Sequence, residues 1–167
     1  MFRIAIRLAL ALLVLGTTPA FAEEVDSARL ARGQYLSRIM DCAGCHMPRG
    51  PDGAPIAEAG LSGGTVGFEI PGLGTFWPPN LTPDKTGLAG WSEAELVAAI
   101  RKGVRPDGRI LAPVMPWPSF LYLTDEDAGA LAAYLLSLPP AENQVPAPIG
   151  PGGAAPAPFY RVTLPKT

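Results

Sequence analysis

The five residues Cys42-Ala43-Gly44-Cys45-His46 contain both cysteines and the single histidine of the 167-residue chain. Two residues between the thiols allow both sulfurs to reach the two vinyl groups of one porphyrin. The residue that follows can then direct its imidazole at the iron from the same side. A Cys-x-x-Cys-His run of this kind is the attachment motif of c-type haem. We therefore expect one haem c, with thioethers at Cys42 and Cys45 and with His46 as an axial iron ligand.

Three other interpretations of the motif compete with haem attachment. A disulfide oxidoreductase also uses Cys-x-x-Cys, but beside a βαβ pattern that this sequence does not contain. A zinc site needs about four ligands, and the motif supplies three of the usual nitrogen and sulfur type. A plain structural disulfide would leave His46 without a role.

The N-terminus carries the three regions of a secretory signal peptide. Arg3 and Arg7 precede the apolar run from Leu8 to Leu15, and Ala20-Phe21-Ala22 is a small-x-small cleavage site. We expect cleavage after Ala22 and export to the periplasm, a compartment that suits covalent haem. The alternative is an uncleaved anchor, but the apolar stretch is interrupted and is shorter than the ~20 residues of a membrane span.

The charge of the mature chain excludes some partners. Two of the 13 basic residues, Arg3 and Arg7, leave with the signal, so 11 basic residues face 15 acidic ones. Nucleic acid and anionic lipid both require clustered lysine and arginine, which this chain does not show. No later apolar stretch approaches the length of a membrane span, so we expect none in the mature chain.

Two helices are predicted on either side of a long loop. Residues 26–40 place Leu36, Ile39 and Met40 at positions i, i+3 and i+4, and this helix runs into the haem motif. A second helix begins at the cap Ser92, has a capping-box Glu95 and the staple residue Trp91, and stops at Gly103. The loop at 47–83 is rich in glycine and proline, and its length suggests that it wraps a haem edge.

A third helix is predicted from the cap Thr124, with three acidic residues in its first turn. Pro139-Pro140 ends it, and its apolar stripe for the core is formed by Leu131, Tyr134, Leu135 and Leu138. The rest of the chain is rich in proline. We therefore divide the chain into a signal peptide at 1–22, a haem domain at 23–138 and an extended or disordered tail at 139–167.

Met115 is the predicted second axial ligand of the iron. The chain has no second histidine, Met1 leaves with the signal, and Met40 and Met47 flank the motif on the His46 side. Met115 can reach the opposite face of the porphyrin, and prolines at 113 and 116 stiffen its backbone. The alternatives are Lys85, Lys102, an open position, and a Met115 that only fills the core.

Aromatic and basic residues near these loops are candidates for contacts with the porphyrin. Trp77 and Trp117 could pack on it or donate to a propionate, and plain core packing is an equal alternative. Arg105 and Arg109 could pair with propionates or face solvent.

The chain resembles a single-haem class I cytochrome c over residues 26–140. A helix leads into Cys-x-x-Cys-His, and Gly33 and Tyr35 match the first-helix pattern that crosses the last helix at Tyr134-Leu135. A narrower group, the cytochrome c domains that take electrons from periplasmic dehydrogenases, is similar in five further stretches. These are Asn80-Leu81-Thr82-Pro83-Asp84, Gly90-Trp91, Arg105-Pro106-Asp107-Gly108-Arg109, Pro113-Val114-Met115-Pro116-Trp117 and Leu123-Thr124-Asp125-Glu126-Asp127.

The resemblance implies an all-α fold with about three to five helices wrapped round one covalent haem. It implies a periplasmic dehydrogenase as electron donor, with another cytochrome or a terminal oxidase as acceptor. Histidine and methionine ligation suits one-electron transfer, because the soft thioether favours ferrous iron and both axial positions are filled. We expect a carrier and not an enzyme. The alternative is a haem enzyme or a gas-binding sensor with an open or labile sixth position.

Overall fold

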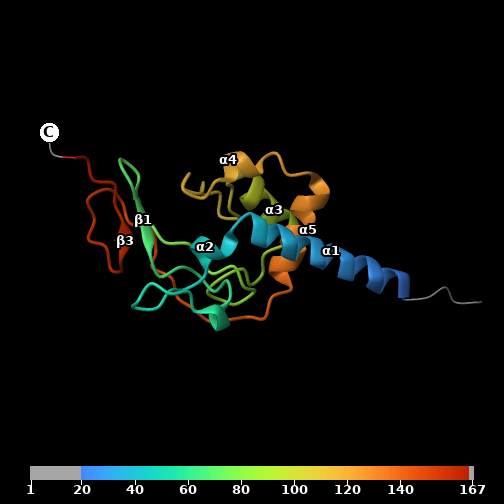
Figure 1. Cartoon of the computed structure of the whole chain (residues 1–167). Helices are drawn as coiled ribbons and strands as arrows, with labels where there is room; N and C mark the ends of the chain where they lie inside the picture. The colour runs from blue at the N-terminus through green and yellow to red at the C-terminus, as the bar shows by residue number, and fades with distance from the viewer. Residues whose placement is uncertain (1–19, 166–167) are drawn as a thin grey trace, which may run out of the picture.

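The computed structural model describes residues 20–165, so most of the predicted signal peptide lies outside the described residues. Within this range no helix is both long and apolar enough to cross a membrane. Figure 1 shows a group of helices on one side of α2 and a small sheet on the other. The elements are α1 (Ala20–Ile39), α2 (Cys42–His46), η1 (Ala57–Ala59), β1 (Gly67–Ile70), β2 (Gly74–Phe76), α3 (Glu93–Lys102), α4 (Trp117–Phe120), α5 (Asp125–Leu136) and β3 (Phe159–Tyr160).

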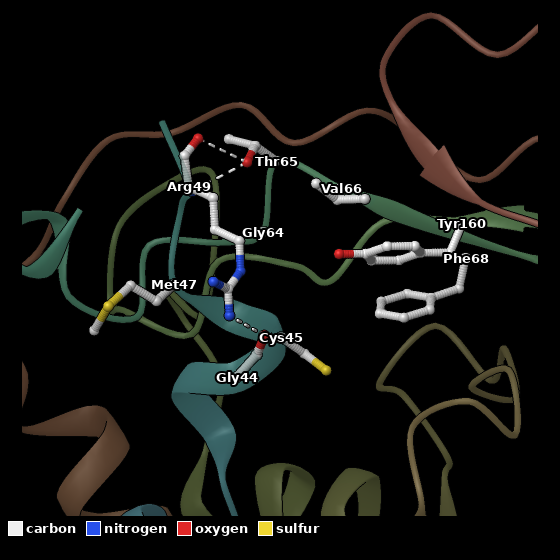
Figure 2. A pocket seen from close by; sticks show the side chains of 9 residues that line it. All are labelled: Gly44, Cys45, Met47, Arg49, Gly64, Thr65, Val66, Phe68 and Tyr160. Atoms are coloured by element: carbon white, nitrogen blue, oxygen red, sulfur yellow. Dashed lines mark hydrogen bonds between the residues drawn. The ribbon is translucent and has the colours of Figure 1, made fainter. Parts of the chain in front are cut away.

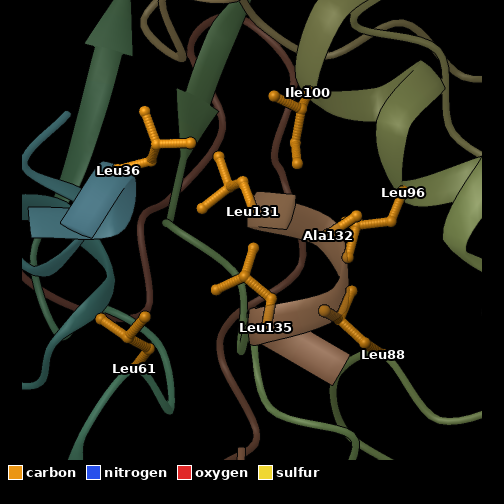
Figure 3. Close-up of a cluster of buried hydrophobic side chains, with 8 residues drawn as sticks. All are labelled: Leu36, Leu61, Leu88, Leu96, Ile100, Leu131, Ala132 and Leu135. Carbon is orange, nitrogen blue, oxygen red and sulfur yellow. The ribbon is translucent and has the colours of Figure 1, made fainter. Parts of the chain in front are cut away.

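The core lies where α1 crosses α5. A Cβ atom built on Gly33 of α1 would lie 2.1 Å from the Ala130 carbonyl oxygen, so only glycine permits this approach of the two helices. Leu36 from α1 meets Leu131 and Leu135 from α5 in a buried apolar cluster (Figure 3). The predicted apolar stripe of the last helix is therefore confirmed.

One residue of the first predicted helix does not face the core. Ile39 is 59% exposed, whereas Leu36 is buried and Met40 packs against the cluster. The helix face toward α5 carries Gly33, Leu36 and Met40. Since successive residues turn by about 100° round a helix, Ile39 lies about 120° from Gly33 and therefore outside this face. The i, i+3, i+4 pattern predicted the helix but assigned this side chain to the wrong face.

The ends of α3 and α5 follow the capping signals in the sequence. The Ser92 side chain accepts from the Glu95 backbone N–H while the Glu95 side chain accepts from the Ser92 N–H, which completes the predicted capping box. Gly103 ends α3 in the left-handed region with φ 67°. Thr124 caps α5 by accepting from the Asp127 N–H at 3.0 Å.

The structure also contains a three-stranded sheet of order β2-β1-β3 that was not predicted from the sequence. β1 pairs with β2 in an antiparallel hairpin and with β3 in parallel, with Phe68 opposite Tyr160. Between α5 and β3 the chain runs extended past the loops that follow α2 (Figure 1). The Pro-rich segment thus returns to the haem motif's side of the molecule.

Candidate haem-attachment site

The helix α2 is a single turn that carries the whole Cys-x-x-Cys-His motif. Asp41 begins it in a left-handed conformation with φ 54°, and its carboxylate accepts from the Gly44 N–H at 3.1 Å. A Cβ on Gly44 would lie 2.2 Å from this carboxylate, so residue 44 must be glycine for the cap to form. The turn places Cys42, Cys45 and His46 on one rigid element.

His46 is held in the tautomer that an iron ligand requires. Its ring is buried, and Nδ1 lies 2.8 Å from the Pro79 carbonyl oxygen. A carbonyl only accepts, so Nδ1 donates its proton and Nε2 keeps a free lone pair. Burial lowers the pKa of His46, against the opposing effect of the Pro79 hydrogen bond. The ring is therefore neutral at neutral pH, which is the form that binds metal.

The two thiols are free, with Cys42 half-buried and Cys45 exposed. Burial raises the pKa of Cys42 and of Cys45, and the nearby Asp41 carboxylate raises each further. Disulfide oxidoreductases depend on a depressed cysteine pKa, so these thiols do not have that character. Figure 2 shows the Cys45 sulfur pointing out from α2, on the side where the Phe68 ring lies.

A zinc site is also disfavoured. Across residues 20–165, no group of three or more His, Cys, Asp or Glu side chains is placed to hold a metal ion.

The cleft beside Cys45 is lined on one side by Arg49 (Figure 2). Arg49 donates to the Gly53 carbonyl at 3.0 Å and to the Gly44 carbonyl at 3.3 Å, which ties the following loop to the motif. On the opposite wall the rings of Phe68 and Tyr160 lie 5.5 Å apart. None of these residues was identified from the sequence, and the pairing of Phe68 with Tyr160 joins positions 92 residues apart.

Met115 lies in the segment between α3 and α4. It is half-buried, its N–H donates to the Ala112 carbonyl at 3.0 Å, and its carbonyl accepts from the Trp117 N–H at 2.7 Å. Pro116 follows it as the N-cap of α4. Its role as an iron ligand stays a prediction.

The competing ligands have other contacts. Met40 packs against the core cluster, and Met47 ends α2 with its N–H donating to the Ala43 carbonyl. The Lys85 ammonium pairs with Glu142 at 3.0 Å, and Lys102 is an exposed residue in the last turn of α3. Met40 and Lys85 thus have other side-chain contacts, and Met115 stays the predicted ligand.

Both candidate indoles donate to backbone carbonyls. Trp77 Nε1 donates to Pro158 at 3.1 Å, and Trp117 Nε1 donates to Leu111 at 3.2 Å. The hypothesis that they donate to a propionate is therefore wrong, because each indole has a single N–H. The Arg105 guanidinium lies 4.9 Å from the centre of the Trp91 ring and beside Asp107, within its own loop.

Comparison with known proteins identifies the family. The family model described as cytochrome c matches residues 30–139. This chain belongs to the cytochrome c family. The cofactor of the family is covalently bound haem c with its iron, and the mainly helical architecture confirms the predicted class I fold.

The relatives of this cytochrome c chain include subunits of dehydrogenases. It is 39% identical over 128 residues to a gluconate 2-dehydrogenase cytochrome c subunit of Pantoea cypripedii, covering 74% of this chain and 27% of that protein. It is 38% identical over 125 residues to the cytochrome c subunit of an alcohol dehydrogenase (quinone) of Gluconacetobacter polyoxogenes, covering 74% and 25%. A fructose dehydrogenase cytochrome subunit of Gluconobacter japonicus is 35% identical over 138 residues, covering 78% and 26%. The chain spans about a quarter of the length of these relatives.

The residues of the motif fit haem c. Two free thiols stand three positions apart on one helical turn, and the neutral imidazole beside them has its Nε2 lone pair free. The Pro79 carbonyl, which accepts from His46 Nδ1, orients this ring and was not identified from the sequence. The only signal that could have indicated it is its position directly before the Asn80-Leu81-Thr82 stretch of the resemblance.

Proposed function

We propose that this chain is a periplasmic one-electron carrier with a single haem c. Cys42 and Cys45 would form the thioethers, and His46 and Met115 would be the axial ligands. The hydrogen bond from His46 Nδ1 to the Pro79 carbonyl is the observation that carries the proposal, because it leaves Nε2 as the ligand atom. When bound, haem c supplies the reversible exchange of one electron between ferrous and ferric iron.

The chain's own residues would tune that exchange. The Pro79 carbonyl fixes the orientation of the imidazole and makes Nε2 a stronger donor. The thioether of Met115 favours the ferrous state and raises the reduction potential. With both axial positions filled there is no place for a substrate, so the chain transfers electrons and does not catalyse a reaction of its own.

The partners follow from the relatives' names. The cytochrome subunits of gluconate, alcohol and fructose dehydrogenases support a periplasmic dehydrogenase as the donor here. Another cytochrome or a terminal oxidase would be the acceptor. Export would take place through the signal peptide, with cleavage after Ala22.

Intact-mass measurement of the protein from a periplasmic fraction tests this proposal. The expected mass is that of residues 23–167 plus one haem, retained after denaturation. The variants Cys42→Ala and Cys45→Ala should each keep one thioether, and the double variant should lose covalent haem. A native protein without the added haem mass would sink the assignment.

Carbon monoxide separates the carrier from its alternative, a haem enzyme or gas sensor. The reduced wild-type protein should not bind carbon monoxide at neutral pH, because Met115 occupies the sixth position. Ready binding, seen as a shifted Soret band, would favour the open or labile site instead.

A further inference from the structure

The segment after α5 contacts the loops around His46. We call residues 141–145 the strap. Alternate strap residues face inward, since Ala141, Asn143 and Val145 are half-buried while the two residues between them are exposed. Figure 1 shows the chain passing these loops on its way from α5 to β3.

The first attachment of the strap is at Asn80, which is 1% exposed. The Asn80 Oδ1 accepts from the Thr82 N–H at 2.9 Å, and this fixes the orientation of the amide. Its Nδ2 then donates to the Ala141 carbonyl at 2.7 Å and to Thr86 Oγ1 at 3.0 Å. The Ala141 N–H donates in return to Thr82 Oγ1 at 3.1 Å. One of the two N–H groups of the buried amide thus depends on the strap for its partner.

The second attachment is at Asn143. Its Nδ2 donates to the Ser62 carbonyl at 3.0 Å and to the Gly63 carbonyl at 3.4 Å. Val145 lies directly on Gly63, because a Cβ built there would be 2.4 Å from Val145 Cγ2. The strap therefore holds two loops, one at residues 61–64 and one at residues 78–82.

Both loops hold His46. The Pro79 carbonyl accepts from Nδ1 of the ring at 2.8 Å, and the Gly63 N–H donates to the His46 carbonyl at 2.8 Å. The Pro79 carbonyl belongs to the peptide unit shared with Asn80, so anchoring Asn80 fixes the direction of that carbonyl. The two loops also bind each other, through Gly64 N–H to Pro78 and Leu81 N–H to Leu61.

We infer that the strap positions the His46 imidazole, with Asn80 and Asn143 as positioning residues that act through the Pro79 and Gly63 loops. The inference rests on the proposed function, in which His46 is an axial ligand. A held Pro79 carbonyl keeps Nε2 a strong donor and stabilises ferric iron. Loosening the strap weakens this donor, so the reduction potential rises.

The test uses the full-length holoprotein labelled with ¹⁵N-histidine, which gives ring signals from one residue because the chain has one histidine. Exchange of the Nδ1–H with solvent is measured in the reduced, diamagnetic state, together with the midpoint potential. In the Asn143→Ala variant the His46 Nδ1–H should exchange about tenfold faster than in the wild type, the effect expected for the loss of one hydrogen-bonding side chain. Its potential should rise, and no charge is changed.

The matched control is Gln144→Ala, because Gln144 is a neutral, exposed strap residue whose side chain, among residues 20–165, donates a hydrogen bond to the neighbouring Val145 carbonyl alone. This variant should match the wild type in both measurements. Val145→Ala should show a smaller acceleration of the same kind, and it decides the matter if Asn143→Ala does not accumulate with haem. The inference would be overturned if Asn143→Ala and Val145→Ala showed the same Nδ1–H exchange rate and midpoint potential as Gln144→Ala. A wild-type protein without haem would instead contradict the proposed function.

Discussion

Replacement of Gly33 by alanine tests the helix crossing that organises the domain. The added Cβ would lie 2.1 Å from the Ala130 carbonyl oxygen and 2.6 Å from Tyr134 Cβ. Neither neighbour can rotate away, since one is backbone and the other is the first side-chain atom. The two helices must separate, and the cluster of Leu36, Leu131 and Leu135 must open with them.

The magnitude follows from two opposing effects. Overpacking of this severity costs about 3 kcal/mol, while alanine in a helix is favoured over glycine by about 1 kcal/mol. The expected net loss for Gly33→Ala is about 2 kcal/mol. Gly129→Ala makes the same change in α5, where the Cβ meets only the ends of the flexible Arg29 and Glu93 side chains at 3.1 and 3.3 Å. That variant should lose nothing and gain up to about 1 kcal/mol.

Urea denaturation of the holoprotein, followed by far-ultraviolet circular dichroism, measures both variants against the wild type. Thermal melting should show Gly33→Ala about 4–8 °C below the wild type for a chain of this size. A Gly33→Ala variant as stable as Gly129→Ala would refute the argument that close helix approach requires a glycine here.

Three further predictions concern the iron, acid stability and docking. Met115→Ala should lower the reduction potential and let carbon monoxide bind the ferrous form, while Met47→Leu should do neither, as optical redox titration and Soret spectra can check. Asp127 has a pKa below its usual value because Arg32 donates a hydrogen bond to its carboxylate. The contribution of Asp127 to stability is therefore present above about pH 4 and is lost as the pH falls through the lowered pKa. The difference in urea midpoint between wild type and Asp127→Asn should shrink accordingly in acid. Val114→Glu adds bulk and charge at an exposed position beside Met115. It should slow stopped-flow reduction by the proposed dehydrogenase donor more than Asp127→Asn does; equal rates would place electron entry elsewhere.

The helices with local signals could be predicted from the sequence. Ser92 and Glu95 lie three residues apart, and the capping box they form depends on no distant contact. Thr124 likewise caps α5 through the N–H of a residue three positions on. Even the crossing at Gly33 was indicated by its resemblance to a first-helix pattern.

The parts that depend on distant pairs could not be predicted in this way. β3 is two residues long and joins β1 across about ninety positions of a chain rich in proline, so no alternation of apolar residues announces it. The hydrogen bond from His46 to Pro79 spans 33 residues. The hydrogen-bond partner of Trp77, the Pro158 carbonyl, lies 81 positions away. Because this partner is not evident in the sequence, contact with the porphyrin was a reasonable prediction for Trp77.

These distant pairs bear on where the folding unit ends. The family model stops at residue 139, close to the boundary at 138 that the composition suggested. Beyond that boundary Ala141 bonds to buried Asn80, and Ile149 exchanges both backbone hydrogen bonds with buried Thr75. Separating these partners would leave buried polar groups unsatisfied, at about 1–3 kcal/mol for each. We therefore propose that the folding unit extends through β3, beyond the predicted boundary at 138, because Ala141 and Ile149 bond to buried residues before that boundary.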